Sequence, residues 1–294
     1  MPRPPDHLHF AGADGPIGAL RWAGIDGAPT VVALHGITAN AWHFDPLAHH
    51  LAGSAHLVAL DLRGRGSAYD HPGPFGMRAH ADDVAAVLAQ LGGPVTLVGH
   101  SMGCYVALMT AALHPDATGH LVLVDGGSRL TVPEGVAVDD ALDTTLGPAI
   151  ERLRRVWSDR VSYHTMWSQH PAFADGISID LERNLLADLI EVDGGFRTAV
   201  NEEAVRHDGR ELLADDEVRG LLDARRGPTT VIRATLGLNG APPPLIDADA
   251  VTRAPQHRWI VADGLNHYTV LLSSEGASLV TAAVRDALIA DPWH

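Results

Sequence analysis

A short glycine-containing turn constrains the fold of this chain more than any other segment. The turn is Gly99-His100-Ser101-Met102-Gly103, between an apolar run at 94–98 and a second one at 104–109. These runs predict a buried strand that turns sharply into a helix, a context that separates the pattern G-x-S-x-G from a chance match. The turn then places the Ser101 hydroxyl at a helix N-terminus, where developing negative charge is stabilised. An ordinary serine in a glycine-rich turn is the alternative interpretation.

Apolar runs alternate with segments of helical periodicity along much of the chain. Two β-like stretches near 7–11 and 17–23 come first, and buried strands are predicted at 30–34, 56–61, 94–98, 121–125, 229–233 and 258–261. Helices are predicted near 41–51, 77–91, 104–113 and 274–289. Continuous apolar strands that alternate with helices are typical of a mostly parallel sheet covered on both faces, so we expect an α/β fold.

This alternation stops between residues 128 and 227. The segment has charged, helix-compatible stretches near 149–157, 181–192, 202–205 and 218–225, and no strong strand signal. We therefore expect a helical cap at 128–227, inserted into a core formed by 1–127 and 228–294. Four large side chains of the cap are candidates for an apolar substrate pocket, although packing of the cap on the core is the alternative. They are Trp157, Tyr163, Met166 and Trp167.

Composition narrows the classes of partner. The formal net charge of −15 argues against nucleic acid or an anionic membrane surface, because basic patches bind both. The 18 histidines are scattered without clusters at zinc spacing, so we expect no metal and no other cofactor. Neither a leader-like apolar run nor a membrane-spanning stretch is evident, so a cytoplasmic protein with a small-molecule substrate is expected. The oligomeric state stays open.

A nucleophilic serine needs a base and donors for an oxyanion. His267 follows the last predicted strand, which is the position expected for the histidine in the chain order serine, acid, histidine. A histidine of a surface loop is the alternative. The expected oxyanion donors are the backbone N–H groups of Met102 and of Ile37, which follows the strand at 30–34. His100 is expected to shape the pocket beside the turn, with a hydrogen-bonded histidine of the core as the alternative.

Two further loops contribute residues for which structural roles are expected. His35 is expected to hold its own loop by hydrogen bonds, and Asp61 and Arg63 to tie the loop after the strand at 56–61 to the sheet. Arg65 is expected to be a solvated loop arginine, with a position facing the pocket as the alternative.

Four motifs together resemble those of α/β-hydrolase-fold enzymes that carry a helical cap. They are His-Gly at 35–36, D-x-R-G-x-G at 61–66, G-H-S-M-G at 99–103 and Asn-His-Tyr at 266–268, in the family's order. The resemblance covers nearly all of the predicted core and much less of the cap. It implies a serine hydrolase with a Ser-His-acid triad, and it is far more specific for the fold than for the substrate.

The acid is where this chain departs from the family pattern. Family members most often place it after the penultimate core strand, but the loop 235–240 contains no carboxylate. Some families of this fold carry the acid one strand earlier, which implies Asp125. Asp247 and Asp249 are alternatives, although N-capping of a helix is enough to explain them. A weak or absent acid is the third alternative.

Serine at position 101 argues against the enzymes of this fold that use an aspartate nucleophile. The expected reaction is hydrolysis of a small-to-medium, largely apolar carboxylic ester or lactone through an acyl-enzyme on Ser101. A carbon–carbon bond hydrolase is an alternative, although no polar clamp for a substrate carboxylate is identified. The sequence is also compatible with a lyase, with a cofactor-free haloperoxidase-like enzyme and with a catalytically silent binding protein.

Overall fold

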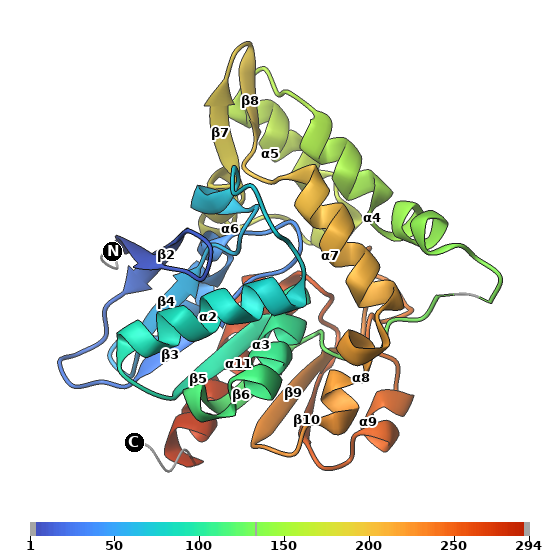
Figure 1. Cartoon of the computed structure of the whole chain (residues 1–294). Coiled ribbons are helices and arrows are strands. Elements are labelled where there is room, and N and C mark those ends of the chain that lie inside the picture. Colours follow the sequence, from blue (N-terminus) through green and yellow to red (C-terminus); the bar gives the residue numbers. More distant parts are fainter. Residues whose placement is uncertain (1–3, 133, 291–294) are drawn as a thin grey trace.

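An eight-stranded sheet with the strand order β1-β2-β4-β3-β5-β6-β9-β10 forms the centre of the molecule (Figure 1). The computed structural model describes residues 4–132 and 134–290. β2 pairs antiparallel with β1 and β4, and all other neighbours in this sheet are parallel. The strands are β1 (Asp6–Ala11), β2 (Pro16–Trp22), β3 (Thr30–Leu34), β4 (His56–Leu60), β5 (Val95–His100), β6 (Thr118–Val124), β9 (Thr229–Ala234) and β10 (Arg258–Ala262).

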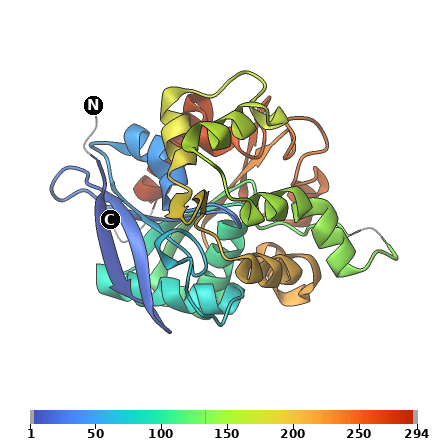
Figure 2. The same ribbon diagram turned by 90° about the horizontal axis from the view of Figure 1, so that it is seen from above.

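Both faces of this sheet are buried under helices (Figure 2). In β3, Val32 and Leu34 belong to one apolar cluster, and Val31 and Ala33 belong to the other. Burial on both faces explains why these strands read as continuous apolar runs, and the predicted α/β architecture is confirmed. The first face is covered by α2 (Met77–Leu91), α3 (Met102–Leu113) and α8 (Asp216–Ala224), and the second by α1 (Asp45–Leu51) and α11 (Ser274–Ala290).

Short helices fill several of the connections between these elements. They are η1 (Ala41–Phe44), η2 (Gly66–Ala68), η3 (Pro115–Ala117), α9 (Asp249–Arg253) and α10 (Thr269–Leu272). No helix in the described ranges combines the length and the apolar character that crossing a bilayer requires.

The segment between β6 and β9, apart from α8, lies above the edge of the sheet that carries Ser101 (Figures 1 and 2). It is mainly helical, as expected, but it also contains a β-hairpin that the sequence interpretation missed. Its elements are α4 (Val138–Arg154), α5 (Arg160–Ser168), η4 (Pro171–Phe173), α6 (Ile179–Leu186), β7 (Leu189–Val192), β8 (Gly195–Thr198), α7 (Glu202–Ala214) and α8.

The hairpin corrects two predicted helices. The helix expected over 181–192 ends at Leu186, because Asp193-Gly194 forms a two-residue turn between β7 and β8, with φ of 86° at Gly194. The helix expected over 149–157 ends at Arg154, because Trp157 pairs with Phe196 of β8. The short stretch expected at 202–205 is instead the start of α7.

The turn between β5 and α3 passes its neighbours too closely for side chains. A Cβ atom at Gly103 would lie 1.9 Å from the carbonyl oxygen of Leu34, and one at Gly99 would lie 2.5 Å from the carbonyl oxygen of Gly103. Ser101 has φ of 55° and ψ of −119°, a conformation that residues with a side chain rarely adopt. Close packing of the strand and the helix therefore holds the serine in a strained conformation.

Replacing Gly103 by Ala is expected to lower the free energy of unfolding by at least about 2 kcal/mol, because the new methyl group forces β3 and α3 apart. Gly220→Ala in α8 is the control, since a Cβ there would meet a single atom at 3.7 Å. That control should be neutral or stabilising by up to about 1 kcal/mol. Urea unfolding of both variants measures the difference, and equal stabilities would contradict the prediction.

Candidate active site

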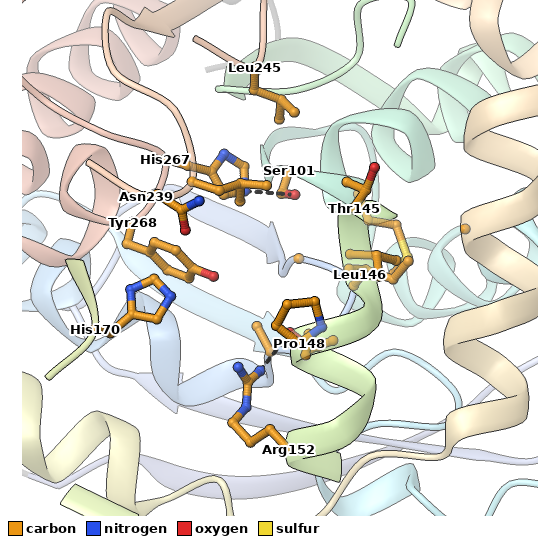
Figure 3. A pocket seen from close by; sticks show the side chains of 18 of the residues that line it. Ser101, Thr145, Leu146, Pro148, Arg152, His170, Asn239, Leu245, His267 and Tyr268 are labelled. Atoms are coloured by element: carbon orange, nitrogen blue, oxygen red, sulfur yellow. Dashed lines mark hydrogen bonds between the residues drawn. The ribbon is translucent and has the colours of Figure 1, made fainter. Parts of the chain in front are cut away.

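Ser101 lies immediately before α3 and lines a cavity of about 500 Å³ (Figure 3). Its backbone N–H donates to the carbonyl oxygen of Val124 at the end of β6, at 3.0 Å. A Cβ atom at Gly126 would lie 2.3 Å from the Ser101 carbonyl oxygen. The loop after β6 therefore packs directly against the turn that carries the serine.

Ser101, His267 and Asp125 form one chain of hydrogen bonds. The Nε2 atom of His267 lies 3.0 Å from Ser101 Oγ, and its Nδ1 atom lies 2.7 Å from Asp125 Oδ2. Since a carboxylate accepts, Nδ1 carries the proton and Nε2 is left to accept the serine proton. This arrangement is the one in which an imidazole can act as a general base for a hydroxyl nucleophile.

Asp125 is held in place by hydrogen bonds of both its backbone and its side chain. Its backbone N–H donates to the Ile232 carbonyl oxygen at 2.8 Å, and its Oδ1 atom accepts from the Ala234 N–H at 3.1 Å. The residue is fully buried and has φ of 47°, an uncommon conformation outside glycine. The carboxylate therefore reaches His267 from a backbone that two neighbours on β9 fix.

The two alternative acids lie elsewhere. Asp247 Oδ1 accepts from the Ala250 N–H at 2.8 Å and pairs with Arg253 at 3.2 Å, and Asp249 begins α9. Capping and charge pairing at a helix start account for Asp247. In the described part of the chain, the carboxylate hydrogen-bonded to His267 is that of Asp125.

Ile37 and Met102 both line the cavity that Ser101 lines. Met102 begins α3, so its backbone N–H has no acceptor inside the helix. A Cβ atom at Gly36 would lie 3.2 Å from Ser101 Cβ, which shows how closely the loop of Ile37 passes the serine. No acceptor for the Ile37 N–H is found among residues 4–132 and 134–290. Two N–H groups without partners beside a serine can stabilise an oxyanion.

Arg65 corrects the expectation of a solvated loop arginine, since its side chain is fully buried. Its Nε atom donates to the Ile37 carbonyl oxygen at 2.9 Å, and its guanidinium pairs with Asp208 of α7. His80 of α2 also contacts Asp208, at 3.1 Å. The sequence could not show this pairing, because Asp208 lies in a segment with no motif and is brought to Arg65 by the tertiary fold.

The Asp208 carboxylate is stabilised in its charged form. Burial alone would raise the pKa of Asp208, but the charges of Arg65 and His80 and their hydrogen bonds outweigh it and hold the pKa well below its ordinary value. A charged pair therefore joins α7 to the loop that carries Ile37.

Three other predicted structural residues make contacts in the interior. Asp61 accepts from the Ala41 and Ser67 N–H groups at 2.9 Å, and Arg63 pairs with Asp83 at 2.6 Å. His35 Nε2 accepts from the Leu62 N–H at 3.0 Å, so its Nδ1 atom carries the proton and donates to the Gly36 carbonyl oxygen at 2.8 Å. These contacts fix the two loops that flank the turn of Ser101.

His100 lines the cavity and also supports the histidine beside it. Its Nε2 atom donates to the His267 carbonyl oxygen at 2.9 Å, and the two ring centroids lie 4.9 Å apart. Burial lowers the pKa of His100 well below its ordinary value, and the neighbouring His267 lowers it further. The imidazole of His100 is therefore neutral.

Three of the four large side chains proposed for the pocket line the cavity: Trp157, Met166 and Trp167. Tyr163 does not, and this expectation is wrong. It is fully buried in the cluster beneath the cavity wall, and its hydroxyl donates to Asp188 at 3.0 Å. A single sequence carries no signal that distinguishes an aromatic residue buried inside such a cluster from one that lines the cavity.

Several polar residues of the cavity were not predicted. They are His43, Arg152, His170, Asp188, Asn239 and Tyr268. Arg152 reads in the sequence as one of several arginines at the end of a charged helix, and Tyr268 as part of a motif without a role of its own. Across the described ranges, no group of three or more histidine, cysteine or acidic side chains is placed to hold a metal ion.

Comparisons with known proteins identify the family of this chain. The model of the alpha/beta hydrolase family matches residues 31–282. The chain is 27% identical over 252 residues to the 2-(acetamidomethylene)succinate hydrolase of Mesorhizobium japonicum, covering 84% of each chain. It is 34% identical over 205 residues to a pimeloyl-[acyl-carrier protein] methyl ester esterase of Neisseria meningitidis serogroup C, covering 67% of this chain and 74% of the esterase.

Among solved structures, the chain resembles an E-2-(acetamidomethylene)succinate hydrolase, with a TM-score of 0.81 and 21% identity. The match covers 97% of this chain and 100% of the other. At 21% identity, this structural similarity shows that the two proteins share a fold and shows nothing about a shared function.

His35→Gln is expected to make the stability of the protein less sensitive to acid. Burial lowers the pKa of His35 well below its ordinary value of 6.5, so below pH 6.5 the unfolded chain binds a proton that the folded protein does not. The free energy of unfolding therefore falls on acidification, by about 1.4 kcal/mol per pH unit from this residue. Glutamine binds no such proton, so the variant should lose less stability between pH 6.5 and about pH 5.

Urea unfolding at each pH measures this slope for both proteins. Parallel slopes for wild type and variant would show that His35 is not held neutral.

Proposed function

Since this chain belongs to the alpha/beta hydrolase family, we propose that it is a serine hydrolase that cleaves a carboxylic ester or lactone through an acyl-enzyme on Ser101. One observation carries the proposal. The hydroxyl of Ser101 lies in a cavity at one end of a hydrogen-bonded chain that continues through His267 to Asp125, with steps of 3.0 and 2.7 Å.

In the proposed reaction, Ser101 Oγ attacks the ester carbonyl carbon while His267 Nε2 takes the hydroxyl proton. The carbonyl oxygen becomes an oxyanion that accepts from the N–H groups of Ile37 and Met102. When the carbon–oxygen bond breaks, His267 returns the proton to the leaving alcohol oxygen. Water then attacks the acyl-enzyme with His267 again as the base, which releases the acid and restores Ser101. Asp125 holds the imidazole tautomer and stabilises its charged form.

We further propose that residues 128–227 act as a cap over a core of 1–127 and 228–294. The cavity supports this division, because its lining comes both from loops of the sheet and from α4, α5 and α7. Residues 1–3 and 291–294 at the ends of the core ranges, and residue 133 of the cap, lie outside the described residues.

Ester hydrolysis is supported by the esterase relative of Neisseria meningitidis, which is 34% identical over the part it shares with this chain. A carbon–carbon bond hydrolase is the second candidate. The observation that favours it is Arg152 in the cavity wall, a polar group of the kind such a reaction needs to hold a substrate carboxylate.

A fluorophosphonate probe is expected to label the wild-type protein at Ser101, because an activated serine attacks the phosphorus as it attacks an ester. Ser101→Ala should remove both the labelling and the hydrolysis of p-nitrophenyl esters. Mass spectrometry of the labelled peptide identifies the site. Absence of labelling on the folded wild-type protein would refute the serine-hydrolase proposal.

Asp125→Asn is expected to lower kcat by about 10⁴-fold, because the amide stabilises neither the required tautomer nor the imidazolium. Asp247→Asn and Asp249→Asn are the matched controls, and each should leave kcat within about threefold of wild type. Steady-state hydrolysis of one p-nitrophenyl ester by all three variants decides the assignment. A large loss in either control with a small loss in Asp125→Asn would assign the acid to the control residue concerned instead.

A further inference from the structure

Arg152 projects from α4 into the wall of the cavity that contains Ser101 (Figure 3). Its Nη2 atom donates to Thr38 Oγ1 at 3.3 Å, and its guanidinium lies 4.7 Å from the ring centroid of Trp167. Its Nε atom is buried and has no hydrogen-bond partner within the described residues. Most of the hydrogen-bonding capacity of this guanidinium is therefore unused.

No carboxylate forms an ion pair with Arg152 in the described ranges. Asp188 lines the same cavity, but its two oxygens accept from Asn40 at 2.8 Å and from Tyr163 at 3.0 Å. A partly buried arginine without an anionic partner is costly, since the Trp167 ring and the Thr38 hydroxyl compensate the desolvation of its charge only in part.

Two neutral side chains near Arg152 offer further donors, in a cavity that Glu151, Arg155 and Asp188 also line. His170 Nδ1 accepts from the Ala172 N–H at 3.2 Å, which leaves the proton on Nε2. Burial lowers the pKa of His170, and the charge of Arg152 lowers it further, so this imidazole is neutral. Tyr268 packs against His170 with ring centroids 5.6 Å apart, and its hydroxyl points into the cavity (Figure 3). Burial raises the pKa of Tyr268, so the hydroxyl keeps its proton.

We propose that Arg152 is the anchor for a carboxylate carried by the substrate, with His170 and Tyr268 beside it. This inference rests on the proposed function, since it names the class of substrate that Ser101 would cleave. The planar guanidinium matches a carboxylate with two parallel hydrogen bonds.

The position of Arg152 relates this anchor to the reaction. Thr38, which accepts from Arg152, directly follows Ile37 in the loop expected to hold the oxyanion. In Figure 3, Arg152 lies across the cavity from Ser101 and His267, with Tyr268 and His170 along one side. A substrate with its carboxylate on Arg152 would therefore extend toward Ser101 with its second carbonyl group. The substrate class becomes the half-ester of a short dicarboxylic acid, which replaces the largely apolar ester expected from the sequence.

Binding to an inactive protein tests the anchor without catalysis. Ser101→Ala protein is titrated calorimetrically with succinate, glutarate and adipate, and the best binder is then titrated into the same protein with Arg152→Met. The expected result is a Kd raised at least about tenfold, as loss of a charged hydrogen-bonded pair implies. Equal Kd values in the two proteins, or no binding of any of the three diacids, would overturn the proposal.

Kinetics give the second test, in otherwise wild-type protein. The substrates are monomethyl adipate and the methyl ester of adipamic acid, which differ by a carboxylate against a carboxamide. Arg152→Met should lower the ratio of their kcat/KM values, acid over amide, by about 10- to 100-fold. Arg152→Lys keeps the charge and loses the planar guanidinium. Its acid-over-amide ratio should therefore lie between those of the wild type and Arg152→Met.

Arg154→Met is the matched control, because Arg154 lies two residues further along, is exposed, pairs with Glu202 and stands outside the cavity lining. It removes the same charge and should leave the ratio unchanged. An equal fall in both variants would indicate a general charge effect and overturn the anchor. If neither ester is hydrolysed but diacid binding still depends on Arg152, the proposed function fails and the anchor stands.

Discussion

The contact between Gly126 and the Ser101 backbone connects the two strand ends from which the site is built. Gly126 packs so closely on the Ser101 carbonyl group that a side chain there would displace the turn, and the Ser101 N–H donates to Val124. The strained serine and the loop after β6 therefore hold each other in place. Asp125, between Val124 and Gly126, takes its position from the same contact. The distance from the hydroxyl to the carboxylate is thus set by backbone packing before any side chain is considered.

This coupling explains how the acid that we propose, Asp125, can lie after β6 instead of after β9. β6 lies between β5 and β9 in the sheet, and the carboxylate directly after β6 lies 2.7 Å from His267 Nδ1. The backbone of β9 still contributes, because the Ala234 N–H donates to Asp125 and the Ile232 carbonyl accepts from it. A strand that carries no acid at its own end therefore orients the acid of its neighbour. The role of the acid is to orient an imidazole, which tolerates either origin as long as the carboxylate meets Nδ1.

The elements that could be predicted from sequence are those whose signal is local. The strands of the core are apolar on both faces, and the turn at Ser101 needs glycine on both sides, so periodicity and spacing locate them. The β7–β8 hairpin also has a local signal, Asp193-Gly194, which the charged surroundings obscured. Arg65, Tyr163 and Arg152 could not be assigned in this way. Whether each is solvated, buried or facing a cavity depends on partners far away in the chain.

Arg65 and Arg152 show why burial alone does not identify a functional arginine. Both contact the loop of Ile37, one through a backbone carbonyl oxygen and the other through the neighbouring Thr38. Arg65 is matched inside the protein by Asp208, so its charge is balanced whether or not a ligand is present. Arg152 has no such match among the described residues, and it lines open volume. The first arginine therefore stabilises the loop whether or not a ligand is bound, whereas the partner that we propose for the second is a molecule that enters the cavity.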